Sequence, residues 1–252
     1  MVGSSMNAAE QPIYKVRRVA SPYPYLPEGY WYKGGVPRET LRRLIHPLSS
    51  PLTVRDFDIF RTKETEDEHD HALSLQYLSD DYEFGHGIEV VEDLTTYFKS
   101  RDLTVNEVAL HHERLGYTKE ADSDLRSLSL RPTQSVCNAH GEPASSTWCK
   151  AVRLTVEGRA QGVSWNLCFP ILPGRIALFD IALNLDRSFL SGLTAGIEFV
   201  ETVKEYGFLQ DAPYGIDGVK YAIEESASTL HQGIRFFRNI PKEVLSSLSL
   251  NT

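Results

Sequence analysis

The pattern of apolar and polar positions changes character near residue 140. Before that point, short apolar or alternating stretches are bounded by glycine and proline, which is typical of short strands mixed with helices. After it, apolar residues recur mainly at helical spacing. We therefore predict an α+β first part that is followed by a mostly helical C-terminal region.

The clearest elements of the first part follow one another closely. The stretch "GYWYKGG" predicts a short strand that ends in a glycine turn, and Pro37 suits the first position of a helix over "PRETLRRLI". The next stretch, "LTVRDFDIF", alternates well enough to be a strand. Farther along, "EHDHALSLQYLS" predicts a helix and "GIEVV" a strand.

A capping box predicts another helix over "TVNEVALHHERLG", because Thr104 and Glu107 have the required spacing and Gly116 suits a left-handed C-cap. After it, "DLRSLSLRPT" alternates as a strand. In the second part three stretches predict helices: "STWCKAVRLTVEG", "FLSGLTAGIEFVETVKEYGFL" and "GVKYAIEESASTLHQGIRFF". Only "RIALFDIAL" favours a strand there.

These patterns divide the chain into three parts. Residues 1–28 contain four prolines and no clear apolar period, so we expect an extended arm. Residues 29–135 form the mixed part and 136–252 the helical part.

Composition is that of an ordinary globular protein, with 41% hydrophobic and 24% charged residues in a chain of 252. No apolar run approaches the roughly 20 residues of a transmembrane helix, so we expect no membrane partner. The N-terminus lacks the apolar core of a secretory signal. The three cysteines lack Cys-x-x-Cys spacing, so we expect them to be reduced thiols: Cys137, Cys149 and Cys168. We expect a cytoplasmic location, with the nucleus as the alternative.

Charge is spread unevenly along the chain, whose net charge is −8. Residues 13–43 carry seven Lys and Arg residues and only two acidic ones, Glu28 and Glu39, whereas residues 64–93 contain no Lys or Arg. Any nucleic-acid surface is therefore expected to be a local patch. The acidic stretch "ETEDEHDH" suits either metal ligands or, more simply, a solvated loop and helix start.

Two aspartates are candidates for metal binding. In a strand Asp56 and Asp58 would project from the same face, and two close carboxylates suit Mg²⁺ together with substrate phosphates. Upstream, Gly34 and Gly35 let a ligand approach the backbone in front of a helix N-terminus, where Arg38 adds a charge. The alternative is a tight turn beside a solvated helix face.

The order of four stretches, "GGVPRETL", "RDFDIF", "SRDLTVNEV" and "ADSDLRSLSLRPT", resembles the nucleotidyltransferase head of the class II tRNA CCA-adding enzyme and bacterial poly(A) polymerase family. The resemblance covers roughly residues 30–132 and extends to "KAVRLTVEG", which is similar to a family helix. It implies a twisted mixed sheet of the polymerase β superfamily and a neck-like role for the helical part.

The resemblance also implies roles for individual residues. Gly34, Gly35 and Arg38 would hold the triphosphate of an NTP, ATP or CTP or both, while Asp56 and Asp58 would bind Mg²⁺ and help to deprotonate an RNA 3′-hydroxyl, of tRNA or another RNA. Three further residues would contact the sugar and phosphates of the nucleotide: Arg101, Asp102 and Asn106. A third carboxylate is expected on a neighbouring strand, with Glu89 the candidate and Glu92 the alternate.

The sequence departs from the family pattern in several places. Glu39 stands where the family has Asp, Ser100 where it has Arg, and the interval from Asp58 to Arg101 is short. Where the family recognises the base with Glu-Asp-x-x-Arg, this chain has "EPASST". Two alternatives therefore stay open: transfer to a protein or small-molecule acceptor, and a degenerate module that binds nucleotide or RNA without turnover.

Overall fold

The computed structural model describes residues 13–54, 57–77, 88–229 and 237–248. Its strands are β1 (Tyr14–Arg18), β2 (Tyr30–Tyr32), β3 (Ile59–Thr62), β4 (Glu89–Val91), β5 (Val108–His111), β6 (Arg114–Thr118), β7 (Ser129–Leu130) and β8 (Asn166–Leu167). Its helices are α1 (Gly35–Ile45), α2 (Asp70–Tyr77), α3 (Leu94–Lys99), α4 (Lys119–Arg126), α5 (Ser145–Ala160), α6 (Leu178–Ser188), α7 (Leu193–Glu205), α8 (Ile216–Thr229) and α9 (Lys242–Leu245). Short 3-10 turns are η2 (Thr104–Asn106), η3 (Gln134–Val136) and η4 (Phe189–Ser191).

The larger sheet is mixed and has six strands in the order β1-β6-β5-β2-β3-β4. Neighbouring strands are antiparallel except β3 and β4, which are parallel with Phe60 opposite Glu89. A second, two-stranded parallel sheet joins β7 to β8. The mixed α+β architecture predicted from the sequence is thus confirmed.

Helices cover both faces of the larger sheet. On one face, α1 and α4 bury Leu41 and Leu125 in a cluster with strand residues that include Tyr32 and Leu110. On the opposite face, α3 packs its aromatic residues against Trp31 and other strand residues. Asp93 caps α3 by accepting a hydrogen bond from the N–H of Thr96.

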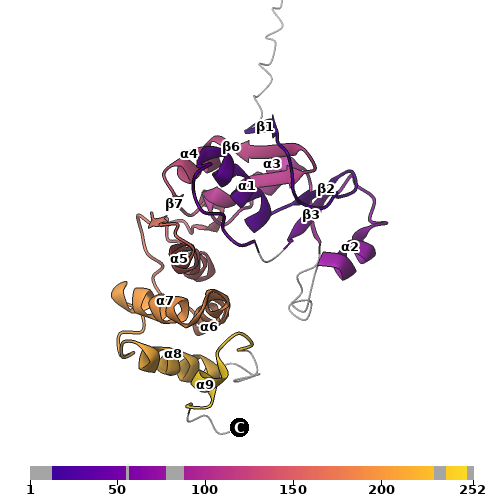
Figure 1. Cartoon of the computed structure of the whole chain (residues 1–252). Coiled ribbons are helices and arrows are strands. Elements are labelled where there is room, and N and C mark those ends of the chain that lie inside the picture. Colours follow the sequence, from indigo (N-terminus) through magenta and orange to yellow (C-terminus); the bar gives the residue numbers. More distant parts are fainter. Residues whose placement is uncertain (1–12, 55–56, 78–87, 230–236, 249–252) are drawn as a thin grey trace, which may run out of the picture.

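Helix α5 lies between the sheet and the other helices of the C-terminal part, which stack away from it (Figure 1). The face with Trp148, Val152 and Val156, predicted from their helical spacing, packs into the helical core. The opposite face places Ala151 and Leu154 in the core of the sheet. The predicted helices over α5, α7 and α8 are confirmed for their described residues.

The predicted helix over residues 104–116 is wrong. Only the single turn η2 forms, and β5 and β6 then make a hairpin whose turn residue His112 has φ 49°. The Glu107 carboxylate accepts a hydrogen bond from the Thr118 hydroxyl at 2.5 Å instead of capping a helix. Gly116 lies within β6, where a methyl group would come within 3.4 Å of the Phe98 ring.

Other predicted elements differ from the structure in type or extent. The strand predicted over "DLRSLSLRPT" is much shorter than expected: its first three residues are the end of α4, and only Ser129–Leu130 is a strand. The stretch "RIALFDIAL" enters helix α6, because Ile181 and Leu185 bury at helical spacing. The strand predicted over "LTVRDFDIF" begins only at Ile59, and β1 lies within the predicted arm. No helix in the described ranges combines the length and apolar character needed to cross a bilayer.

Candidate active site

The diglycine turn and Asp58 meet where α1 begins. Gly34 has φ 67° and ψ −123°, a conformation that L side chains rarely adopt. A methyl group built on Gly34 would lie 3.0 Å from Oδ2 of Asp58. The N–H of Lys33 donates to the carbonyl of Asp58 at 2.8 Å and so joins the two segments. Only glycine fits here without strain, and the carboxylate of Asp58 faces the turn.

The second glycine, Gly35, is under less steric constraint than Gly34. Gly35 is the first residue of α1, and a methyl group there would make only an ordinary contact of 3.5 Å with Cγ1 of Val54. Within the described ranges no side chain caps the N-terminus of α1, so its first amide groups have no described side-chain acceptor. Pro37 lies in the first turn, although two positions later than predicted. The turn therefore presents backbone donors beside an acidic side chain.

Asp56, the predicted partner of Asp58, lies outside the described residues. Asp58 itself directly precedes β3 and is half-buried. The described ranges contain no cluster of three or more His, Cys, Asp or Glu side chains that could hold a metal ion. The role predicted for Asp56 and Asp58 as a Mg²⁺-binding pair stays a prediction.

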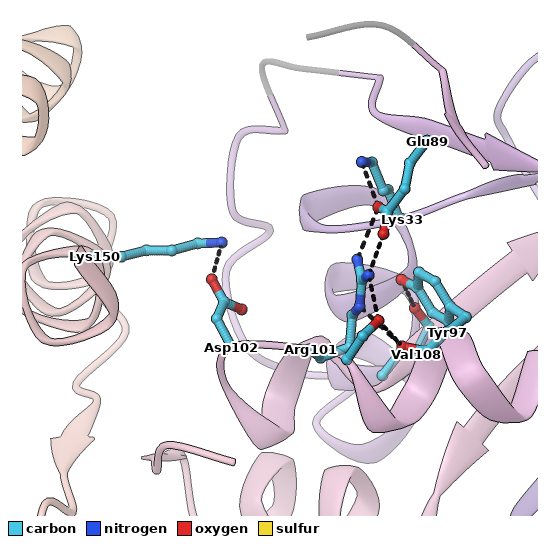
Figure 2. Close-up of polar contacts among 8 residues, drawn as sticks. Lys33, Glu89, Tyr97, Arg101, Asp102, Val108 and Lys150 are labelled. Atoms are coloured by element: carbon cyan, nitrogen blue, oxygen red, sulfur yellow. Dashed lines mark hydrogen bonds and ion pairs between the residues drawn. The ribbon is translucent and has the colours of Figure 1, made fainter. Parts of the chain in front are cut away.

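A chain of polar contacts runs from α1 to α5. Nη1 of Arg38 donates to Oδ1 of Asn106 at 2.7 Å, and Nδ2 of Asn106 donates to Oδ1 of Asp102 at 2.8 Å. Across the gap, Nζ of Lys150 on α5 lies 2.6 Å from Oδ2 of Asp102 (Figure 2). Three residues that were predicted to contact the nucleotide therefore lie together, and Lys150 completes their network.

The charges of this network are set by burial and by neighbouring groups. Burial by itself raises the pKa of Asp102, but the ammonium of Lys150 and hydrogen bonds from Lys150 and Asn106 outweigh it and hold that pKa well below its ordinary value. Burial and the charge of Arg153 lower the pKa of Arg38. An ionised Asp102 thus faces a crowded group of cations.

A second cluster joins Glu89 to two cations. Arg101 forms a bidentate pair with the Glu89 carboxylate, with Nη2 to Oε1 at 2.5 Å and Nη1 to Oε2 at 3.2 Å. Lys33 adds a contact of 2.7 Å to Oε2 (Figure 2). Burial raises the pKa of Glu89, yet Arg101 and Lys33 together lower it below its ordinary value. The carboxylate is ionised and accepts three hydrogen bonds from the two cations.

Tyr97 shows that the two clusters share one neighbourhood. Burial raises the pKa of its phenol most, and although Arg101 opposes that shift, the charges of Glu89, Asp102 and Asp58 raise the pKa further. The guanidinium of Arg101 lies 4.1 Å from the centre of the Tyr97 ring. Asp58, Glu89 and Asp102, which the sequence suggested, therefore all act on the same phenol.

Glu89 and its alternate differ in their surroundings. Glu89 lies on β4 beside β3, the neighbouring strand on which a third carboxylate was expected. Glu92 instead pairs with Lys63, and both side chains are more than 60% exposed. Of the two, only Glu89 belongs to the cluster, although its present partners are cations.

A cavity of about 640 Å³ opens between the sheet part and the helices. It is lined by the network residues Asp102 and Lys150, by Arg153 and Asn184, and by residues of the segment "EPASST". From that segment Thr147 is buried, and its hydroxyl has no hydrogen-bond partner among the described residues. The cavity is large enough for a nucleotide-sized ligand.

Helix α1 carries a buried ion pair where the sequence also allowed a solvated charged face. Arg42 is fully buried and donates to both carboxylate oxygens of Glu39, at 2.7 and 2.8 Å. It also donates to the Ser49 hydroxyl and the Ser50 carbonyl, while Glu39 accepts from the N–H of Leu52 at 2.9 Å. The alternative of a solvated face is wrong for Arg42.

Two residues of the site were not predicted from the sequence. Lys33 directly precedes the diglycine turn, and its place next to Gly34 was the available signal. Lys150 begins the stretch "KAVR", which is similar to a family helix, but its partner Asp102 lies 48 residues away. Such a contact leaves no local pattern.

The sequence was compared with known proteins. No family model matches the chain, and no curated protein matches it.

Proposed function

We propose that this protein is a Mg²⁺-dependent nucleotidyltransferase that transfers a nucleoside monophosphate from an NTP to the 3′ end of an RNA. The observation that carries the proposal is the Gly34 turn, which has no room for a side chain and faces the Asp58 carboxylate at the start of a helix. Backbone donors at such a turn suit phosphate oxygens, and an adjacent carboxylate suits a hard cation. The residues present therefore fit a metal-bound triphosphate.

In the proposed reaction the RNA 3′-oxygen attacks the α-phosphorus, the bond to the β-phosphate breaks and pyrophosphate leaves. Asp58, with Asp56, would hold Mg²⁺ and take up the hydroxyl proton. When bound, Mg²⁺ supplies charge neutralisation at the phosphate oxygens. The turn of Gly34 and Gly35 would orient the triphosphate, so that catalysis rests on positioning and electrostatics.

The remaining groups would position the nucleotide. Arg38 and Asn106 lie on the path from the turn to Asp102, whose ionised carboxylate suits a ribose hydroxyl. Arg101 would reach phosphate oxygens by exchanging the carboxylate of Glu89 for them. The cavity beside Asp102 would take the base, which would meet Thr147 together with charged groups of the cavity wall, among them Glu142 and Arg153.

The test is label transfer from NTPs to total RNA in the presence of Mg²⁺. Replacement of both carboxylates, Asp56→Ala with Asp58→Ala, should reduce transfer on the order of 100-fold or more, since it removes the groups that hold the metal. Asp217→Asn, an exposed site on α8, is the matched control and should retain activity. Transfer that persists in the double variant rejects the assigned site.

A second candidate keeps this site but uses a protein or small-molecule acceptor. It is favoured by the cavity segment "EPASST", which has no arginine where the family recognises the base. Mass spectrometry of a mixed-lysate reaction separates the two: nucleotidylated protein with unlabelled RNA supports this candidate.

A third candidate is a module that binds nucleotide without turnover. It is favoured by the ion pairs that already occupy Glu89 and Arg101. Calorimetry that shows Mg²⁺-independent NTP binding, together with no release of pyrophosphate, supports it against both enzymes.

A further inference from the structure

The outer edge of β1 is an open strand edge. β1 lies at one end of the sheet order and pairs with β6 over all five residues (Figure 1). Residues 15–18 are exposed. No other strand of the described ranges pairs with its far side. An edge of this kind presents unpaired N–H and C=O groups to a partner.

The register identifies which peptide groups face outward. Arg18 is the last residue of β1 and lies opposite Arg114. The next residue, Val19, donates its N–H to the carbonyl of Glu113 at 2.8 Å. In an antiparallel ladder the residues that bond to the neighbour alternate, so Lys15 and Arg17 face β6 as Val19 does. The peptide groups of Tyr14, Val16 and Arg18 therefore point away from the sheet, roughly 6.8 Å apart.

The side chains of this edge are strongly basic. Lys15, Arg17 and Arg18 are all exposed, and none of them forms an ion pair with another residue of the described ranges. In a chain of net charge −8, this strand carries Lys15 and Arg17 on one face and Arg18 on the other, so its edge is positive on both faces. Opposite charges on directly paired strand residues stabilise a ladder, and like charges destabilise it.

We propose that β1 accepts an extended acidic segment of a partner protein as a seventh strand of the sheet. The outward peptide groups of Val16 and its neighbours supply the main-chain hydrogen bonds of strand addition, and Lys15 and Arg17 select Glu or Asp on the incoming strand. This surface is distinct from the candidate active site, since β1 and β3 lie at separate positions of the sheet.

A second copy of this chain fits the edge poorly. Antiparallel pairing of two β1 strands about Val16 would set Lys15 against Arg17 of the other copy, and like charges in that position repel. A nucleic acid would satisfy the cations through its phosphates but would leave the outward peptide groups without a ladder. The combination of an open ladder and unpaired cations favours an acidic peptide.

The test uses the full chain and a fluorescent heptapeptide of alternating Glu with Val or Thr. We expect it to bind, to weaken at least tenfold when its Glu residues are replaced by Gln, and to weaken similarly on Lys15→Gln with Arg17→Gln. Val16→Pro removes an outward N–H without breaking the ladder to β6, and should lower affinity at least tenfold. Val16→Thr keeps that N–H and should stay within twofold of the wild type.

Amide hydrogen exchange is a second, independent measurement of which N–H groups of β1 the peptide contacts. On peptide binding, exchange should slow at Val16 and Arg18, whose N–H groups point outward. Of two peptides N-methylated at one or the other set of alternate residues, the one whose methyl groups face β1 should not bind, which keeps the test valid if Val16→Pro does not fold.

Three results overturn the proposal. The first is equal affinity of the Val16→Pro and Val16→Thr proteins. The second is tight binding of a 12-nucleotide single-stranded RNA that depends on the cations alone, without binding of the acidic peptide. The third is binding of neither probe, which shows that the charges only protect the edge from aggregation.

Discussion

The two glycines of the diglycine turn make a matched pair for testing the site. In Gly34→Ala the new methyl group would meet Oδ2 of Asp58 at 3.0 Å and the residue would keep φ near 67°. In Gly35→Ala the methyl group would meet only Cγ1 of Val54 at 3.5 Å. The same chemical change at adjacent positions therefore has different structural consequences.

The expected magnitudes follow from these geometries. A non-glycine residue in such a sparsely populated conformation costs about 1 to 3 kcal/mol. Loss of glycine freedom in the unfolded chain returns about 0.4 to 1 kcal/mol at either position. We expect Gly34→Ala to lower the free energy of unfolding by about 1 to 2 kcal/mol and Gly35→Ala to raise it by up to about 1 kcal/mol.

Urea unfolding followed by circular dichroism measures both effects. A third variant, Gly34→Ala with Asp58→Ala, separates the close contact from the backbone strain, because it removes the carboxylate and leaves φ unchanged. We expect the double variant to recover about 0.5 to 1 kcal/mol relative to additivity. Equal unfolding free energies for the two single alanine variants would refute the geometry of the turn.

Three further predictions concern the polar groups around the site. Arg42→Met should lower the free energy of unfolding by about 3 to 5 kcal/mol, because it leaves the buried Glu39 carboxylate unpaired, and adding Glu39→Leu should restore much of that loss in the same urea assay. A single variant that costs under about 1 kcal/mol contradicts the buried pair. Burial, aided by Glu120 and Asp124, raises the pKa of Glu107 to about 7 from 4.5. A raised acid pKa means that the folded state binds the proton more tightly, so its contribution to stability is full below about pH 4.5 and is lost as pH rises through about 7. Discounted for solvent screening, the loss is about 1 to 2 kcal/mol, and Glu107→Gln should flatten unfolding curves measured across that range; an unchanged slope contradicts the shift. Lys150→Ala should raise the pKa of Asp102, which carboxyl NMR titration can follow, whereas Lys220→Ala on α8 should leave it unchanged; an unmoved Asp102 resonance contradicts the link between α5 and the sheet part.

Local signals allowed part of the fold to be predicted. The strand, turn and helix around Gly34 and Pro37 follow from residues that restrict their own backbone, and α5 follows from the helical spacing of Trp148, Val152 and Val156. The β5–β6 hairpin was missed because Thr104 and Glu107 imitate a capping box, while strand pairing depends on partners that a local window does not contain.

The candidate site shows the same division. Gly34, Arg38 and Asp58 lie in short stretches with their own signals, and the structure places them around one turn. The ion pairs that surround them were not predicted, since Glu89 with Lys33 and Lys150 with Asp102 join residues far apart in the chain. Burial of Arg42 likewise depends on the loop that folds over it.

The two-sided packing of α5 determines where the protein can be divided. The sheet core includes Leu154, Val163 and Trp165, all of which come after the change of pattern near residue 140. A fragment that stopped at residue 135 would expose the apolar surface those side chains cover. We expect such a fragment to aggregate when produced alone, and the shortest soluble N-terminal piece to extend beyond Trp165.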